Sequence, residues 1–244
     1  MSSSSNPVVV ITGGAGGIGR ETAKLFVASG ATVVLVDVSK ERLAAVKAEL
    51  GADGVLTIVS DLSDHAKCVA ALEAAGRAVH ALVHLAGLSL PDPDKAEDMS
   101  IYDAVLDSNT RTAYLMVRAF SGRHDGTGQA PARVVLTSSL AYRRGGLDRI
   151  AYSAAKGAIA AMVRASARKL APTVHVNGVA PGIILTTMTE KLIETRHDAL
   201  MQEIPIRRFG HPSEVASVIE FLVGPASSYV NGQIINIDGG TVHS

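Results

Sequence analysis

The sequence has one cysteine, no tryptophan and no excess of charge of either sign. The single thiol, Cys68, excludes an internal disulfide and a cysteine-rich metal cage. Acidic and basic residues number 23 each, so the chain has no general electrostatic footprint for nucleic acid or an anionic membrane. No apolar run reaches the roughly 18 residues of a membrane-spanning helix, and the N-terminus lacks the basic and apolar segments of a signal peptide. We therefore expect a cytoplasmic protein that binds neither nucleic acid nor membrane.

What the sequence does contain is an alternation of short β-branched runs with longer stretches rich in alanine and leucine. The apolar runs cover 8–11, 32–36, 55–59, 81–85, 134–136, 174–179 and 234–237. The helical patterns cover 17–29, 40–50, 64–76, 99–120, 151–170 and 212–222. Runs that are apolar throughout are typical of parallel strands buried on both faces. The pattern predicts an α/β protein: a single-domain Rossmann fold over 1–244, with a doubly wound parallel seven-stranded sheet and helices on both faces. Residues 186–207 interrupt the alternation and are predicted to form a substrate lid.

A glycine-rich segment, TGGAGGIG, follows the first apolar run and precedes a helical pattern. In that context glycines let the backbone approach a pyrophosphate at a helix N-terminus. The spacing is ambiguous. Gly14, Gly16 and Gly19 fit GxGxxG. Gly13, Gly17 and Gly19 fit TGxxxGxG, whereas Gly13, Gly16 and Gly19 fit TGxxGxxG. These patterns indicate different dinucleotide-binding families, and a turn without a ligand is the alternative to all three.

Asp37 stands at the end of the second run, close to the interval of about 20 residues at which a carboxylate meets the adenosine ribose. Such a carboxylate accepts hydrogen bonds from both ribose hydroxyls and repels a 2′-phosphate. The positions at which an arginine or lysine could receive that phosphate hold Gly14, Ala15 and Val38 instead. The predicted cofactor is therefore NAD, with NADP less favoured. The alternative role for Asp37 is to cap the helix that follows.

Tyr152 and Lys156 are four residues apart in a helical pattern, so their side chains share one face. A tyrosine pKa near 10 must fall by roughly 3 units before the phenol can act as a base near neutral pH. A neighbouring lysine and a positively charged nicotinamide can lower it together. Ser139 lies just past the fifth apolar run, at the carboxyl edge of a parallel sheet where ligands bind. Its hydroxyl can hold a substrate oxygen while Tyr152 exchanges a proton with it.

With these residues the chain resembles the classical short-chain dehydrogenase/reductase family over nearly its whole length. The resemblance implies a catalytic set of Asn109, Ser139, Tyr152 and Lys156. It also implies a cofactor-binding set of Gly13, Gly17, Ile18, Gly19, Asp37, Asp61, Leu62, Ala86, Gly87, Tyr152, Lys156, Pro181, Gly182, Ile184 and Thr186. The sequence departs from the family where His84-Leu85 replaces Asn-Asn before Ala86-Gly87. We interpret His84 as a buried structural residue hydrogen-bonded to the backbone rather than a catalytic one.

The resemblance implies an NAD(H)-dependent oxidoreductase that interconverts a secondary alcohol and a ketone, similar to 3-oxoacyl-carrier-protein reductases. Tyr152 would be its general acid and base. Two alternatives remain open: an isomerase or epimerase that uses the cofactor transiently, and a catalytically silent nucleotide-binding regulator. The histidines show no metal-binding spacing, so no metal is predicted.

The substrate is expected to be a small alcohol or ketone with an apolar part, because apolar residues surround the predicted site. They are Leu88, Leu90, Leu140, Tyr142, Leu147, Ile183, Leu185, Met188 and Leu192. The resemblance also implies a homotetramer, formed through the long helices 99–120 and 151–170.

Overall fold

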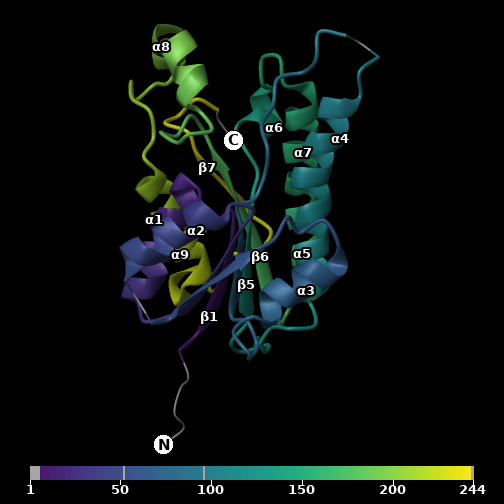
Figure 1. Cartoon of the computed structure of the whole chain (residues 1–244), viewed down its shortest axis with the longest axis vertical. Helices are drawn as coiled ribbons and strands as arrows, with labels where there is room; N and C mark the ends of the chain where they lie inside the picture. Colours follow the sequence, from purple (N-terminus) through teal and green to yellow (C-terminus); the bar gives the residue numbers. More distant parts are fainter. Residues whose placement is uncertain (1–5, 52, 96, 243–244) are drawn as a thin grey trace, which may run out of the picture.

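One parallel sheet of seven strands forms the centre of the computed structural model, which describes residues 6–51, 53–95 and 97–242 (Figure 1). The strand order is β3-β2-β1-β4-β5-β6-β7. The strands are β1 (Val8–Thr12), β2 (Thr32–Asp37), β3 (Val55–Val59), β4 (Ala81–His84), β5 (Ala132–Thr137), β6 (Val174–Pro181) and β7 (Ile234–Ile237). The order reverses direction at β1, which is the topology of a doubly wound sheet. The predicted fold class is confirmed.

Helices cover both faces of the sheet (Figure 1). On one face lie α1 (Gly17–Ala28), α2 (Lys40–Leu50) and α9 (Pro212–Val223). On the other lie α3 (His65–Glu73), α5 (Thr112–Phe120) and α7 (Ile150–Leu170). Successive residues of β1 point to opposite faces, so Val8 and Val10 pack under one set of helices while Val9 and Ile11 pack under the other. Burial on both faces explains why the strands are apolar without alternation.

The predicted helix over 99–120 is wrong in one respect, because it is not continuous. It consists of α4 (Ser100–Leu106), a π-helix η1 (Asp107–Arg111) and α5. Two side chains donate hydrogen bonds to backbone carbonyls of this segment. Asn109 Nδ2 donates to the Val105 carbonyl at 2.9 Å, and the Thr112 hydroxyl donates to the Ser108 carbonyl at 2.6 Å. The wider turn carries Asn109 toward the carboxyl edge of the sheet. Single-turn π-bulges of this kind occur frequently at functional sites.

Segment 186–207 contains α8 (Glu190–Glu203), which stands apart from the other helices in Figure 1. The backbone is not helical at Arg196 (φ −137°, ψ 22°), so α8 is kinked there. Short elements absent from the sequence prediction are α6 (Ala141–Arg144) and the 3₁₀ turn η2 (Pro225–Ser227). Within the described ranges, no helix is both long and apolar enough to cross a membrane.

Candidate active site

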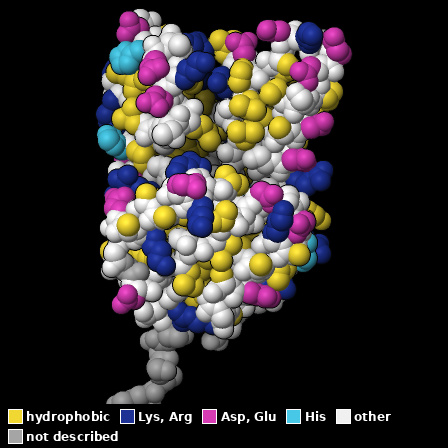
Figure 2. Space-filling view, viewed as in Figure 1, with side chains coloured by type: hydrophobic (Ala, Val, Ile, Leu, Met, Phe, Trp, Pro, Cys, Tyr) yellow, Lys and Arg dark blue, Asp and Glu magenta, His cyan; other side chains and the backbone are white. Residues whose placement is uncertain are grey.

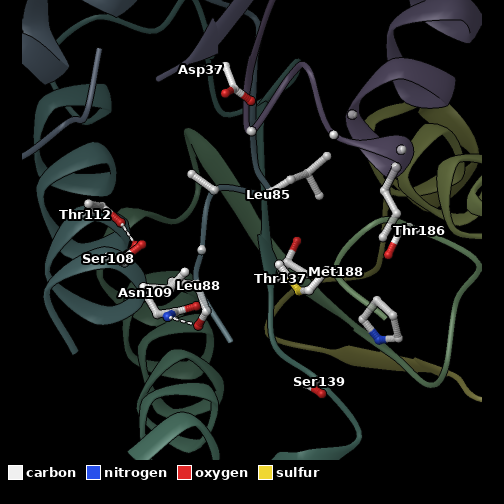
Figure 3. Close-up of a pocket in the computed structure, with 18 of the residues that line it drawn as sticks. Asp37, Leu85, Leu88, Ser108, Asn109, Thr112, Thr137, Ser139, Thr186 and Met188 are labelled. Carbon is white, nitrogen blue, oxygen red and sulfur yellow. Dashed lines mark hydrogen bonds between the residues drawn. The ribbon is translucent and has the colours of Figure 1, made fainter. Parts of the chain in front are cut away.

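A cavity of about 420 Å³ lies beyond the carboxyl ends of the central strands (Figure 3). Every residue that the sequence assigned to the cofactor or to catalysis lines it. They are Gly13, Gly17, Ile18, Gly19, Asp37, Asp61, Leu62, Ala86, Gly87, Asn109, Ser139, Tyr152, Lys156, Pro181, Gly182, Ile184 and Thr186. The topology brings them together because parallel strands end at one edge of the sheet. The roles assigned to them remain predictions.

The glycine loop forms one wall of this cavity and is packed too tightly for larger residues. Gly13 has φ +64°, and a Cβ there would lie 2.9 Å from the Ala86 amide nitrogen. A Cβ on Gly19 would collide with the Gly13 carbonyl oxygen. Gly14 does not line the cavity: it packs on Leu35 and donates its N–H to the β2 backbone. The spacing that starts at Gly14 is therefore not the one that faces the cavity.

Asp37 reaches the far end of the cavity from β2 (Figure 3). Its carboxylate accepts hydrogen bonds from the amides of Ala15 at 3.2 Å and Ser39 at 3.1 Å. Arg42 donates to the same carboxylate at 2.9 Å and also lines the cavity. The sequence analysis missed Arg42. Arg42 lies in the first turn of α2, which brings its side chain back to Asp37. The five-residue spacing between Asp37 and Arg42 is the sequence signal that could have indicated this contact.

Ser139 lies at the opposite end of the cavity from Asp37 (Figure 3), and Tyr152 and Lys156 line the cavity beside it. Burial raises the pKa of the Tyr152 phenol, opposed by a hydrogen bond from Ser139 and by the charge of Arg149. Lys156 Nζ lies 5.5 Å from the centre of the Tyr152 ring and donates to the Thr137 carbonyl at 2.9 Å. Burial lowers the pKa of Lys156 to about 7. The sequence analysis attributed a lowered Tyr152 pKa partly to Lys156, but the charge that acts to lower this pKa is that of Arg149, and burial outweighs it.

Asn109 presents an unpaired oxygen to the cavity. Its Nδ2 donates to the carbonyl of Leu88 at 2.8 Å (Figure 3) and to that of Val105 at 2.9 Å, and the two bonds fix the amide. Its Oδ1 is buried and has no hydrogen-bond partner among the residues that the structure describes, and the same holds for Thr137 Oγ1 on the neighbouring wall. Buried polar atoms rarely lack partners, so each calls for a ligand group or water. Together with the tight glycine wall, these atoms fit a bound dinucleotide.

His84 is buried at the end of β4 and bridges two elements of the site. Thr12 Oγ1 lies 2.8 Å from its Nδ1, and Thr112 Oγ1 lies 3.3 Å from its Nε2. Thr112 gives its proton to the Ser108 carbonyl, so it must accept from His84 Nε2–H, and Nδ1 then accepts from Thr12. The partners are side chains rather than the backbone predicted. Burial lowers the pKa of His84 to about 3, so the ring stays neutral at working pH.

Replacing His84 with alanine is expected to destabilise the protein by about 2–4 kcal/mol, because it opens a cavity and removes the group that accepts from the Thr12 hydroxyl and donates to that of Thr112. Urea denaturation measures the loss. His65→Ala is the control, since His65 is exposed at the start of α3 and its loss should change stability little. Equal stabilities for the two variants would contradict the structural role of His84.

A second cavity, of about 540 Å³, adjoins the first at Ser139 and Tyr152 and lies between α6, α7 and α8. The residues of the predicted apolar wall that line it are Leu140, Leu147, Ile183, Met188 and Leu192. The other members of that predicted wall do not line this cavity. The sequence analysis missed the charged lining residues Arg149, Arg196 and Glu203, which lie in segments that resemble ordinary solvated surface.

Comparison with known proteins agrees with this architecture. Residues 13–242 match the family model described as enoyl-(acyl carrier protein) reductase. A 3-oxoacyl-[acyl-carrier-protein] reductase of Thermotoga maritima is 38% identical, with 96% of this chain and 97% of that protein covered. An NAD-dependent glycerol dehydrogenase of Listeria innocua is 33% identical, with 96% and 92% covered. A solved structure from Brucella melitensis, described as a short-chain dehydrogenase/reductase of the glucose/ribitol dehydrogenase type, has a TM-score of 0.92 at 37% identity and covers 98% of each chain.

The fold and site define a nicotinamide-dependent oxidoreductase of CH–OH and keto groups. The chain belongs to the short-chain dehydrogenase/reductase family, so the family predicted from its motifs is confirmed.

Proposed function

We propose that this protein is an NAD(H)-dependent dehydrogenase/reductase that interconverts a secondary alcohol and the corresponding ketone, with Tyr152 as the general acid and base. The observation that carries the proposal is that Ser139 and Tyr152 lie where the two cavities meet, with Lys156 beside the Tyr152 ring. One cavity suits a dinucleotide and the other a small substrate. Ser139 and Tyr152 line both cavities, at the place where the cofactor and the substrate would react.

Tyr152 and Ser139 act on the substrate oxygen. In the oxidation direction the Tyr152 phenolate removes the hydroxyl proton, and in reduction the phenol returns it. Ser139 donates a hydrogen bond to the same oxygen and stabilises the charge that develops there. The backbone holds Ser139 in place, because the Ala141 amide donates to its Oγ at 3.2 Å. A bound nicotinamide would supply the hydride acceptor or donor.

Lys156 and Asn109 support proton movement behind the phenol. Lys156 has a pKa of about 7 because it is buried, so it can gain or lose a proton near neutral pH. The unpaired Asn109 Oδ1 lies next to Gly87, and Lys156 Nζ borders the same glycine. A water between them would connect Tyr152 and Lys156 to solvent.

The preference for NAD rests on the position of the Asp37 carboxylate at the adenosine end of the cavity. The glycerol dehydrogenase of Listeria innocua, whose name specifies NAD, supports this preference. We also propose a homotetramer, because α4 and α5 expose Tyr102 and Tyr114 to solvent in the single chain. Large exposed aromatic side chains on neighbouring helices are typical of protein–protein contacts.

The proposed reaction is tested with a panel of secondary alcohols and ketones, each assayed with NAD(H) and NADP(H). We expect net change in NADH absorbance with at least one pair, and a higher kcat/KM with NAD(H). An isomerase or epimerase would form product without net change in absorbance. A silent regulator would bind NADH and turn over nothing, and either result would overturn the proposal.

Replacing Asp37 with alanine is expected to change the cofactor preference toward NADP by about 10- to 100-fold. The variant removes a carboxylate that repels the 2′-phosphate and frees Arg42, which pairs with it at 2.9 Å. The measurement is kcat/KM with NADH and NADPH. The double variant Asp37→Ala, Arg42→Ala should gain less with NADPH than the single variant. No change in the NADPH to NADH ratio would show that Asp37 does not select the cofactor.

A further inference from the structure

The second cavity carries an excess of positive charge. Its charged lining side chains are Arg144, Arg149, Arg196 and Glu203. Arg144 and Glu203 form an ion pair that ties α6 to α8, so their charges cancel. Within residues 6–51, 53–95 and 97–242, neither Arg149 nor Arg196 forms an ion pair with a carboxylate. Figure 2 shows a hollow in this part of the molecule with basic side chains along its α8 side.

Arg149 stands immediately before α7, three residues from Tyr152. Its Nε donates to Ser89 Oγ at 3.2 Å and its Nη1 to the Leu147 carbonyl at 3.4 Å. These bonds hold the half-buried side chain against the cavity and leave Nη2 without a partner in the described part of the chain. The charge of Arg149 also acts on the Tyr152 phenol. Arg149 and Tyr152 line the same cavity.

Arg196 approaches the same cavity from α8. It is half-buried and occupies the one position of α8 with non-helical backbone. Two guanidinium groups from separate elements thus line one cavity with Ser139 and Tyr152. Like charges gathered in a partly desolvated cavity repel each other, and an anionic ligand relieves that repulsion. The planar guanidinium fork matches the two oxygens of a carboxylate.

We propose that the substrate is a short-chain keto acid or hydroxy acid whose carboxylate is bound by Arg149 and Arg196. This inference rests on the proposed dehydrogenase function and names its substrate class. Arg149 precedes Tyr152 by three residues and lines the same cavity, so a carboxylate bound by Arg149 would be joined to the reacting carbon by a short chain. Leu147, Met188 and Leu192 also line this cavity and would contact the apolar carbon chain of the substrate.

The experiment compares each keto acid with its amide, which has nearly the same shape and no charge. The pairs are pyruvate and pyruvamide, acetoacetate and acetoacetamide, and levulinate and levulinamide, each reduced with NADH. We expect kcat/KM to favour the acid by about 10- to 100-fold in at least one pair, because a hydrogen-bonded charge contributes that much. Added salt should reduce the preference by screening the charges.

Arg149→Gln and Arg196→Gln should each lower the acid-to-amide ratio by about tenfold, mainly through a higher KM for the acid. The amide kinetics control for folding and for any effect of Arg149 on Tyr152, since both would affect acid and amide alike. Arg149→Lys should restore part of the preference. Lys47→Gln removes one exposed charge on α2, lines neither cavity and should leave the ratio unchanged.

The possible outcomes distinguish failure of the keto-acid proposal from failure of the proposed dehydrogenase function. Reduction of neutral ketones with no preference for any acid overturns the keto-acid proposal and leaves the dehydrogenase function standing. An acid preference that survives in both glutamine variants overturns the assignment to Arg149 and Arg196. If no acid, amide or neutral ketone is reduced although NADH binds, the dehydrogenase function fails and the inference fails with it.

Discussion

Tyr152→Phe is expected to lower kcat by about a thousandfold while the variant still binds NADH. The phenol is the only group proposed to exchange a proton with the substrate oxygen, and phenylalanine keeps the ring that packs near Val105 and Ala155. The fold and the cofactor cavity should therefore be unchanged. Steady-state assays measure kcat, and quenching or transfer fluorescence of NADH measures binding.

The control for this variant is Tyr142→Phe. The Tyr142 hydroxyl accepts a hydrogen bond from Arg143 at 2.7 Å and lines neither cavity. Loss of that hydroxyl should leave kcat within about twofold of the wild type, as for most surface changes. If Tyr152→Phe retained a tenth or more of the wild-type kcat, another group would have to carry the proton.

The pH dependence of oxidation and of reduction follows from the ionisation of the Tyr152 phenol. Oxidation needs the phenolate of Tyr152, so its rate should rise with pH until the phenol has ionised. Reduction needs the phenol, so its rate should fall over the same interval. Burial raises the Tyr152 pKa in the protein, and the Ser139 hydrogen bond and Arg149 oppose that rise. Replacing Arg149 should therefore move both profiles to higher pH.

The sheet could be predicted from the sequence because the central strands are buried on both faces. That burial demands continuous apolar runs, such as Val33 to Val36, and few other structures produce them. The sequence also predicted that the cavity residues lie together, because the carboxyl ends of parallel strands meet at a single edge of the sheet. Gly13 after β1, Asp37 at the end of β2 and Ser139 after β5 all follow from this rule.

The π-helix and the charged cavity wall could not be predicted. The apolar periodicity of 99–120 is compatible with one helix, and the wide turn depends on where the Asn109 and Thr112 side chains find carbonyls. Arg149 and Arg196 lie in a loop and on a surface helix, where arginines are usually solvated. Their lack of carboxylate partners in the described ranges emerges only from the tertiary structure, which brings Arg196 of α8 and Arg149 before α7 to the same cavity. The low pKa of Lys156 likewise requires knowledge of its burial.

Lys156→Met is expected to abolish most activity and yet make the protein more stable. Lys156 is only 4% exposed, and its Nζ has a carbonyl partner but no carboxylate within the described ranges. Replacing a buried charge with an apolar side chain of similar length commonly stabilises a protein, here by about 1–3 kcal/mol after the lost hydrogen bond is counted. For a chain of this size that is a rise in Tm of about 2–12 °C. We expect kcat to fall by about 100-fold or more, because Tyr152 loses its proton partner.

The pH dependence of this gain has a definite sign. Burial lowers the pKa of Lys156 from 10.5 to about 7 in the folded protein. Below pH 7 the lysine is charged in both the folded and the unfolded state, so the folded state bears the full cost of the buried charge. Between pH 7 and 10.5 the unfolded state binds the extra proton, so wild-type stability rises with pH and the advantage of the variant shrinks. Tm values at pH 6 and pH 9 measure this, with Lys169→Met as the exposed control on the same helix. A Lys156→Met variant less stable than wild type at pH 6 would mean that other groups in the site compensate the buried ammonium.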